Sequence, residues 1–343
     1  PVLAPQCQDR SWPTVFATWT NNNNKFPHGR FTMRYRHQFR ALLASLCSLA
    51  CCLSFATAQD AGKNPWDREV YFGEQHMHTA NSPDAFVIGV RQTWDEAYEW
   101  ALGNEVKLST SGAVIKKNTP YDFVAITDHA EYFGIMPSLI DPKDPLSKTD
   151  LAKKIQDPKA DPKAPDSAIN IILGTLISGK PLTEYVSPEL QSNNWKRYVA
   201  TANKYNDPGK FTTLLAYEWT SIPKGRNMHR HVFFRNYTGP VVPFTAFDSI
   251  YPEDLWTFLE IQRNQGTDCF AIPHNGNLSD GWMFSPNKFL GGPMDARYAA
   301  RQQAKEPLTE IIQTKGSSDT HPLFSPNDEF ADFEIQQNMI NVG

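Results

Sequence analysis

The histidine pair His76 and His78 stands one residue apart, and residues 73–75 separate it from an apolar segment at residues 70–72. In an extended strand, side chains alternate between two faces, so both imidazoles lie on the same face. Two imidazoles at this spacing can bind one divalent ion, and histidine nitrogen is a preferred ligand of zinc and also suits iron. A solvated strand can carry such a pair by chance, so the motif indicates a metal site only in combination with others.

Other apolar segments of the chain also end in histidine or carboxylate side chains. Asp128 and His129 directly follow the segment at residues 123–127, and Glu218 follows the one at residues 214–217. A buried carboxylate requires a cation or hydrogen-bond donors around it, because burial without a partner is costly. Three further histidines continue the pattern: His229, His231 and His274. Together these positions favour a metal centre over a set of hydrogen-bonded core residues.

Six short segments rich in β-branched and aromatic residues predict the strands that position these side chains. They comprise residues 69–78, 121–129, 211–219, 228–235, 269–274 and 308–313. Helical patterns with start or stop signals occupy residues 93–104, 187–210 and 251–266. This succession predicts an α/β fold with right-handed βα units and a mostly parallel sheet. In a barrel of that kind, the side chains that follow the strands meet at one end.

Two regions depart from the pattern. Residues 137–190 begin with a stretch rich in Pro, Lys and Asp, which predicts an insertion that either borders the mouth of the site or forms a solvated loop. Towards the C-terminus, Asp319 and His321 form a D-x-H motif only nine positions after Glu310. That spacing is too short for a crossover helix and another strand, so we expect both residues in a loop near the site and an incomplete C-terminus.

The N-terminal sequence predicts export. Residues 33–58 contain a basic start, an apolar run and the cleavage signal Ala56-Thr57-Ala58, and the apolar run is short for a membrane span. We therefore expect a periplasmic or extracellular protein without a stable membrane span after cleavage. Residues 1–32 would be an upstream non-native or unstructured segment, and residues 59–343 the folded domain. Cys269 is the single cysteine of that domain, and its apolar surroundings predict a buried, inert thiol.

Composition and charge exclude other classes of protein. Apolar residues make up 40% of the 343 residues, which is enough for a sizeable core and far from a disordered composition. The formal net charge is −4, so nothing indicates a nucleic-acid-binding surface.

The order of the motifs resembles the polymerase-and-histidinol-phosphatase (PHP) superfamily. Within it, the chain is similar to the domain-of-unknown-function 3604 family over most of residues 68–335. The segments that carry the resemblance are "YFGEQHMHTANSPDAF", "YDFVAITDHAEYFG", "EWTS", "HRHVFFR", "IPHNGNLSDG" and "THPLFSPNDEFADFE". The resemblance implies a distorted (β/α)7-type PHP barrel, incomplete at the C-terminus here. It also implies two or three divalent metal ions, with zinc as the first expectation and manganese or iron as alternatives.

The resemblance assigns roles to individual positions. The implied metal ligands are His76, His78, Asp84, His129, Glu218, His229 and His274. Glu218 matches the bridging carboxylate, and Asp84 belongs to the loop of the first motif. His229 fits its position better than His231, although the doubled histidine leaves that choice open. The D-x-H motif with which the superfamily closes its site would be absent if Asp319 and His321 are loop residues.

These residues predict a metal-dependent hydrolase, most simply a phosphoesterase acting on a small anionic substrate. Divalent ions held by imidazoles and a carboxylate lower the pKa of water and neutralise charge on a phosphoryl or carbonyl oxygen. In this hypothesis Glu218 bridges two ions, and Asp128 or His231 assists proton transfer. Three cations near the second histidine pair could contact the substrate or simply be solvated: Lys224, Arg226 and Arg230.

Two other functions are compatible with the sequence. Amidohydrolases also begin with H-x-H on a barrel strand and cleave amides, esters or lactones. They often use a strand-end lysine where this chain has Glu218, and Asp128-His129 is not expected in them. The second alternative is an exported metal-binding or assembly-forming protein without catalytic activity.

Overall fold

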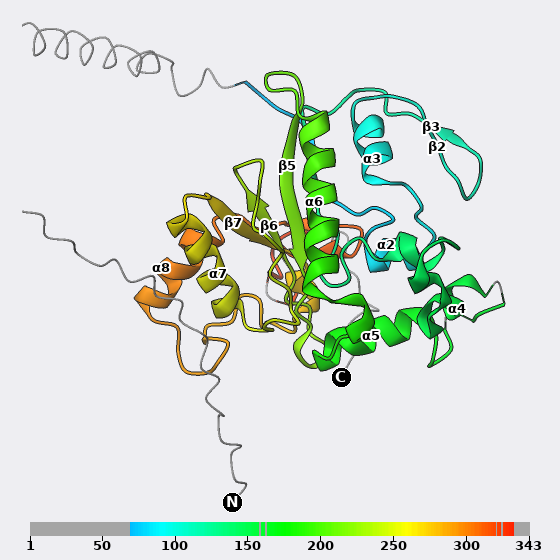
Figure 1. Ribbon diagram of the computed structural model, residues 1–343. Coiled ribbons are helices and arrows are strands. Elements are labelled where there is room, and N and C mark those ends of the chain that lie inside the picture. Colours follow the sequence, from blue (N-terminus) through cyan, green and yellow to red (C-terminus); the bar gives the residue numbers. More distant parts are fainter. Residues whose placement is uncertain (1–68, 158, 162, 320, 324, 333–343) are drawn as a thin grey trace, which may run out of the picture. The chain divides into compact units, whose positions relative to one another are not determined.

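A five-stranded mixed sheet forms the centre of the protein (Figure 1). The computed structural model describes residues 69–332 except 158, 162, 320 and 324, so the expected signal peptide at residues 33–58 and the segment 1–32 lie outside it. In spatial order the strands are β1 (Gly73–Met77), β4 (Phe123–Ile126), β5 (Thr212–Trp219), β6 (Arg230–Phe234) and β7 (Cys269–Pro273). The expected α/β class is confirmed. Among the described residues the sheet stays open, with β1 and β7 as its edges.

The expectation of a mostly parallel sheet is wrong for the second half of the sheet. β1, β4 and β5 pair in parallel, but β6 is antiparallel to both β5 and β7. Residues 220–229 join β5 to β6 and contain only the short 3-10 helix η4 (Pro223–Gly225). Such a short connection joins antiparallel neighbours, because a parallel crossover needs a dozen or more residues. The start of β6 therefore lies beside the carboxyl ends of β5 and β7.

The last predicted strand, at residues 308–313, is also different in the structure. Only Ile312–Gln313 is a strand (β8), and it pairs with β9 (Gly316–Ser317) in a separate two-stranded hairpin. Upstream of it, the backbone N–H of Glu310 donates to the carbonyl of Pro273 at 3.0 Å. This backbone hydrogen bond places the segment before β8 against the end of β7.

Helices cover one face of the sheet, as the helical patterns predicted. α3 (Trp94–Ala101), α6 (Pro188–Tyr205) and α7 (Pro252–Asn264) bury large side chains against the strands, and α6 runs along β5 (Figure 1). Thr93 and Glu96 form a capping box that starts α3, and Ser187 caps α6 ahead of a proline. Each fully buried large side chain contributes about 1.5–3 kcal/mol to this packing.

The opposite face of the sheet carries only a small apolar cluster. It contains Ala125, Ala216, Phe233 and Ile272. Because side chains alternate along a strand, the residues two positions after Ala216 and Ile272, and two positions before Phe233 in the antiparallel β6, share this face. Those residues are Glu218, His231 and His274. One face of the sheet is therefore apolar and covered by helices, and the opposite face carries ionisable side chains at one end.

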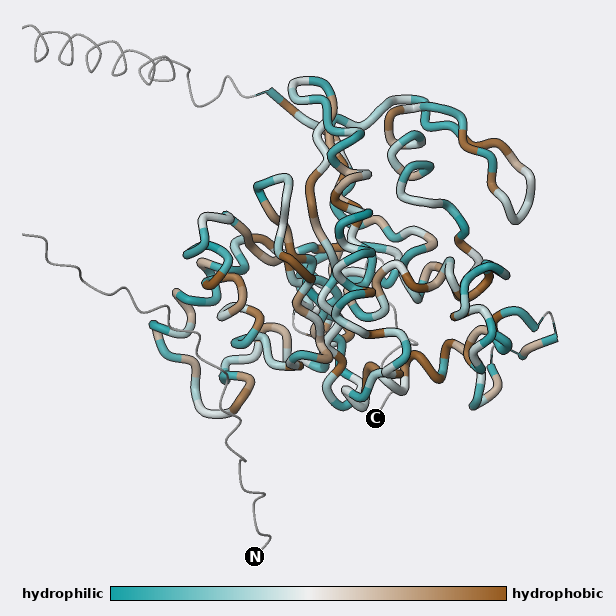
Figure 2. The backbone as a smooth tube through the Cα atoms, in the orientation of Figure 1, coloured by the Kyte–Doolittle hydropathy of each residue, from teal (hydrophilic) through white to brown (hydrophobic). Residues whose placement is uncertain are grey.

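Residues 137–190 are packed, so a purely solvated loop is the wrong interpretation. The helices of this region are η1 (Met136–Leu139), η2 (Pro145–Lys148), α4 (Asp150–Gln156), α5 (Ala168–Ser178) and η3 (Thr183–Tyr185). Figure 2 shows hydrophobic segments along α5 as well as along the central strands. Leu139, Leu151 and Ile172 form a second core cluster with Phe86 of α2 (Pro83–Val87). The region thus supports the short helix that carries Asp84.

The remaining elements are small. β2 (Val106–Lys107) and β3 (Val114–Ile115) form a hairpin, and η5 (Gly276–Leu278) follows β7. α8 (Ala296–Lys305) packs near β7.

β1 and β4 approach closely at Gly73, where a Cβ would collide with the carbonyl oxygen and ring of Phe123. Cys269, at the start of β7, is a buried free thiol, as expected, and burial raises its pKa to about 11. No helix within the described residues is long and apolar enough to cross a membrane.

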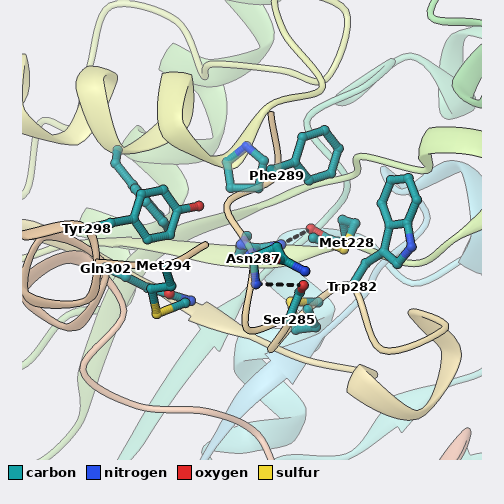
Figure 3. A pocket seen from close by; sticks show the side chains of 12 residues that line it. Met228, Trp282, Ser285, Asn287, Phe289, Met294, Tyr298 and Gln302 are labelled. Carbon is teal, nitrogen blue, oxygen red and sulfur yellow. Dashed lines mark hydrogen bonds between the residues drawn. The ribbon is translucent and has the colours of Figure 1, made fainter. Parts of the chain in front are cut away.

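Arg230 is buried on the helix-covered face, so neither a substrate contact nor a solvated charge describes it. Its Nε donates to Glu306 Oε1 at 2.8 Å, and the indole of Trp256 donates to the same oxygen at 2.7 Å. The adjacent pocket is lined mainly by aromatic and methionine side chains (Figure 3). Alternation places Arg230 on the face opposite His229 and His231. This pocket therefore lies behind the histidines rather than among them.

Arg230→Met alone should lower the free energy of unfolding by about 3–5 kcal/mol, because Glu306 is left as a buried carboxylate without its cation. The double variant Arg230→Met with Glu306→Leu should recover most of this loss. Urea unfolding followed by circular dichroism measures both. Lys210→Met, which removes an exposed ion pair with Asp207, is the matched control and should change little. Equal losses in the single and double variants would contradict a structural ion pair.

Candidate metal centre

Glu218 lies at the centre of a histidine cluster. It is directly opposite His231 in the β5–β6 ladder, and its side chain is only 1% exposed. Its Oε2 is 2.8 Å from Nε2 of His78, and its Oε1 is 3.0 Å from Nε2 of His274. Nδ1 of His229 contacts the same Oε1 at 2.5 Å. The two carboxylate oxygens thus face different sets of imidazoles.

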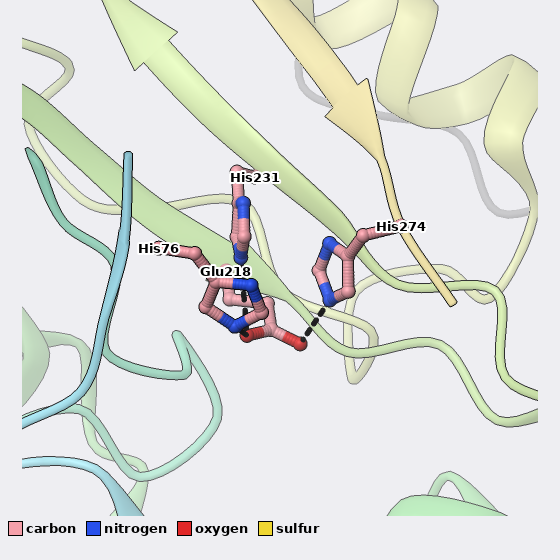
Figure 4. Close-up of side chains that lie close together, drawn as sticks. All are labelled: His76, Glu218, His231 and His274. Atoms are coloured by element: carbon pink, nitrogen blue, oxygen red, sulfur yellow. Dashed lines mark hydrogen bonds and ion pairs between the residues drawn. The ribbon is translucent and has the colours of Figure 1, made fainter. Parts of the chain in front are cut away.

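Two groups of possible metal ligands share Glu218. The first consists of His76, Glu218, His231 and His274, and the second of His78, His129 and Glu218. Within each group the ligand atoms lie within 4.8 Å of one another. Figure 4 shows the four side chains of the first group converging from three strands and the end of β7. This arrangement could hold one divalent ion in each group, with Glu218 between them.

The first group includes His231 rather than His229, which is the reverse of the expected assignment. Nε2 of His231 is 3.5 Å from Glu218 Oε2, on the side of the carboxylate where His76 also lies. His231 has this position because the antiparallel register pairs it with Glu218, so that both side chains project from the same face. His229 precedes β6 and contacts only the other oxygen.

Partners behind the histidines orient their rings. Both oxygens of Asp84 are 3.0 Å from Nδ1 of His78, and one is 3.4 Å from Nε2 of His129. The hydroxyl of Thr220 contacts Nδ1 of His129, and Glu310 Oε2 is 2.9 Å from Nδ1 of His76. Sequence reasoning missed Thr220 and Glu310 as site residues. Glu310 stands in an apolar segment, the same signal that identified Glu218.

The donor set fits a divalent ion. Several buried atoms of the cluster have no hydrogen-bond partner within the described part of the chain. They are Nε2 of His229, Nδ1 of His231 and Nδ1 of His274. Buried polar atoms normally have partners, and leaving one unsatisfied costs about 1–3 kcal/mol. Imidazole nitrogen and carboxylate oxygen are the ligands that zinc and related metals prefer.

The electrostatics keep the carboxylate ionised and several imidazoles neutral. Burial opposes the charge of Glu218, but neighbouring histidines, chiefly His129 and His274, hold its pKa well below the usual range. Burial lowers the pKa of His274 to about 3 and that of His229 to about 4, and it also lowers the pKa of His231. Neutral imidazoles and an ionised carboxylate are the protonation states that bind a metal.

The pKa values of the two histidines in the second group, His78 and His129, are raised rather than lowered. Burial disfavours the charged form of His78, but Asp84 and Glu218 outweigh it and raise the pKa of His78 well above its usual value. Glu218 and Asp84 likewise overcome burial and raise the pKa of His129. In the metal-free protein these two imidazoles therefore take part in ion pairs.

Asp128 is buried outside both groups. Its oxygens accept hydrogen bonds from the backbone N–H of Thr79 at 2.6 Å, the Thr79 hydroxyl at 2.8 Å and the indole of Trp94 at 2.7 Å. Burial raises the pKa of Asp128 despite these donors. The carboxylate thus joins the loop after β1 to α3 and holds it against the end of β4.

The remaining candidate residues belong to neither ligand group. Asp319 and His321 are outside helices and strands, as expected, and neither belongs to a ligand group. Arg226 pairs with Asp280 at 2.7 Å and lies 4.5 Å from the ring centre of Trp282. Lys224 lies 5.9 Å from the same ring. Both cations lie in the loop at residues 220–229 that joins β5 to β6.

The metal-free protein should be most stable near the ordinary histidine pKa of about 6.5. Below it, unfolding adds protons to His229, His231 and His274, whose pKa values are lowered in the folded state, so stability falls as pH falls. Above it, unfolding releases protons from His78 and His129, so stability falls as pH rises. Urea midpoints from pH 4 to 9 with a chelator present measure this profile.

Asp84→Asn is the control for this profile. It removes a cause of the raised pKa values of His78 and His129 and should flatten mainly the alkaline side. A stability that rises steadily across the whole pH range would contradict the arrangement of charges.

Asp128→Asn should lower the free energy of unfolding by about 1–3 kcal/mol, because an amide NH₂ must then face one of the three donors. The number of bound metal ions per chain should stay unchanged, since Asp128 contributes to neither ligand group. Urea unfolding and elemental analysis test the two parts, with the exposed Asp141→Asn as control. Loss of metal without loss of stability would instead make Asp128 a ligand.

Comparison with known proteins gives a family. No curated protein and no solved structure matches the chain. A family model described as "Protein of unknown function (DUF3604)" matches residues 65–343, which include β1 and every residue of both ligand groups. The chain therefore belongs to the DUF3604 family.

Proposed function

We propose that this protein is a metal-dependent hydrolase of the phosphoesterase type. The observation that carries the proposal is the shared position of Glu218, which is buried between two groups of histidines. A carboxylate between two imidazole groups is the arrangement expected of a bridging ligand in a two-ion centre, which suits displacement at phosphorus. Zinc is the first expectation, with manganese or iron as alternatives.

Each group would hold one ion. His76, His231 and His274 would bind the first, His78 and His129 the second, and Glu218 both. Bound divalent ions lower the pKa of water and neutralise charge that develops on a phosphoryl oxygen. Asp84 then acts through His78, whose Nδ1 it contacts, and keeps Nε2 turned towards Glu218.

His229 is our candidate for proton transfer, in place of Asp128 and His231. Asp128 already accepts three hydrogen bonds, and His231 belongs to the first ligand group. Nδ1 of His229 contacts the bridging carboxylate, while its Nε2 is buried without a hydrogen-bond partner in the described structure. A neutral imidazole with one free nitrogen can accept a proton and release it.

We further propose that the sheet belongs to a PHP-type barrel. Helices cover one face, and the ligands stand on the other face at the end where β1, β4, β5 and β7 finish. That placement suits a barrel whose interior would be the ligand-bearing face. A bridging Glu218 in place of a strand-end lysine favours the phosphoesterase over an amidohydrolase. The export signal in the sequence supports a periplasmic or extracellular site of action on a small anionic substrate.

The purified protein should contain about two divalent ions per chain and should hydrolyse at least one aryl phosphate or phosphodiester. Glu218→Gln should lose most of the metal of both groups, because its amide can offer only one neutral oxygen. Elemental analysis and a screen of phosphoesters, esters and amides measure these outcomes. Glu184→Gln, at an exposed glutamate of η3, is the matched control.

The outcomes separate the alternatives. Less than one ion per chain would refute the metal centre. Full metal occupancy with hydrolysis of amides or lactones alone would favour the amidohydrolase class, and full occupancy with no hydrolysis would favour a metal-binding protein.

A further inference from the structure

We infer that Glu310 is a positioning residue that sets the orientation and proton position of His76. This inference rests on the proposed metal centre, of which His76 would be a ligand. Glu310 Oε2 lies 2.9 Å from Nδ1 of His76, although 234 residues separate the two in the sequence. The Glu310 side chain is 7% exposed, so water competes little for this contact.

The contact fixes which ring nitrogen carries the proton. A carboxylate accepts hydrogen bonds and has none to donate, so Nδ1 of His76 must be the donor. In the neutral ring, Nε2 is then unprotonated and its lone pair is free. This nitrogen is 3.8 Å from Glu218 Oε2, on the side of the ring that faces the first ligand group. Glu310 therefore holds His76 in the tautomer that binds a metal.

Other side chains hold Glu310 itself in place. Gln75 Nε2 donates to Glu310 Oε2 at 2.8 Å, and Gln313 Nε2 donates to Oε1 at 3.0 Å. Gln313 also donates to Asn275, the residue after His274. Both oxygens of Glu310 are thus used, and the carboxylate cannot rotate without breaking these contacts.

A β-bulge explains why two consecutive residues reach the same carboxylate. Between Glu74 and Met77 the register of β1 against β4 shifts, so β1 contains one extra residue. Simple alternation would direct Gln75 away from His76, but the bulge allows both side chains to contact Glu310. Bulges re-aim side chains in this way beside functional sites.

The backbone brings Glu310 to this position from the other edge of the sheet. Its N–H donates to the carbonyl of Pro273 at the end of β7, and the Thr309 hydroxyl donates to the same carbonyl at 3.2 Å. The segment before β8 therefore crosses the ligand-bearing edge and connects β7 to β1. Such carboxylate–histidine–metal arrangements raise the basicity of the ligand and are commonly worth about 10–100-fold in metal affinity.

The test compares the full-length protein with Glu310→Met, which removes the acceptor at similar volume, and with the conservative Glu310→Asp. In the metal-free protein at pH 8.5, two-bond ¹H–¹⁵N spectra report the tautomer of His76, whose signal is identified by its loss in His76→Gln. The unaltered protein should show the proton on Nδ1, and Glu310→Met should show it on Nε2. Zinc affinity, measured by chelator competition, should fall about 10–100-fold in Glu310→Met and less in Glu310→Asp.

Glu184→Gln is the surface control and should match the unaltered protein in both measurements. Circular dichroism identifies a variant that has lost its fold, in which case Glu310→Asp decides the outcome through the tautomer. A proton on Nε2 of His76 in the unaltered protein, or unchanged zinc affinity in Glu310→Met, would overturn the inference. If the unaltered protein binds no zinc, the proposed function fails, while the tautomer measurement still tests the role of Glu310.

Discussion

The burial of one ionised carboxylate determines the arrangement of the candidate site. Glu218 is almost completely removed from water, and an isolated charge in that position would cost several kcal/mol. The imidazoles that surround it offset this cost by charge and by hydrogen bonds. They come from the end of β1, the residues after β4, the start of β6 and the end of β7. Each strand of the sheet is therefore tied to the same side chain.

The buried ion pair of Arg230 with Glu306 lies on one face of the sheet, and the ionisable side chains of the candidate site lie on the other face. In the segment at residues 228–235, Arg230 projects towards the helices and pairs with Glu306, whereas its two histidine neighbours project towards Glu218. The same alternation operates in β5 and β7, where apolar residues precede Glu218 and His274 on one face. A shift of β6 by one residue would bury His231 among aromatic side chains and place Arg230 beside the ligand groups. The register of β6 is therefore under strong constraint from both faces.

Local patterns in the sequence predicted most elements and the gathering of histidines, because burial periodicity and helix caps act over a few residues. The predicted parallel direction of β6 was wrong, because the apolar pattern of a strand buried on both faces does not show in which direction the strand runs. Connection length does contain that information, since residues 220–229 leave no room for a crossover helix. Asp128 was assigned to catalysis because a carboxylate beside a histidine looks the same whether its partners are metals or the donors of Thr79 and Trp94. Glu310 was missed because its contact with His76 depends on folding across 234 residues.

The choice between His229 and His231 shows why spacing alone cannot assign a ligand. Both histidines lie on one face, and both are within reach of Glu218, so alternation treats them as equal. The register distinguishes them: His231 is paired with Glu218 inside the ladder, and His229 stands one step beyond its end. His231 therefore approaches the oxygen that His76 and His78 also face, while His229 approaches the oxygen shared with His274. Since the register follows from the length of the β5–β6 connection, that loop determines which of the two imidazoles lies directly opposite Glu218 in the ladder.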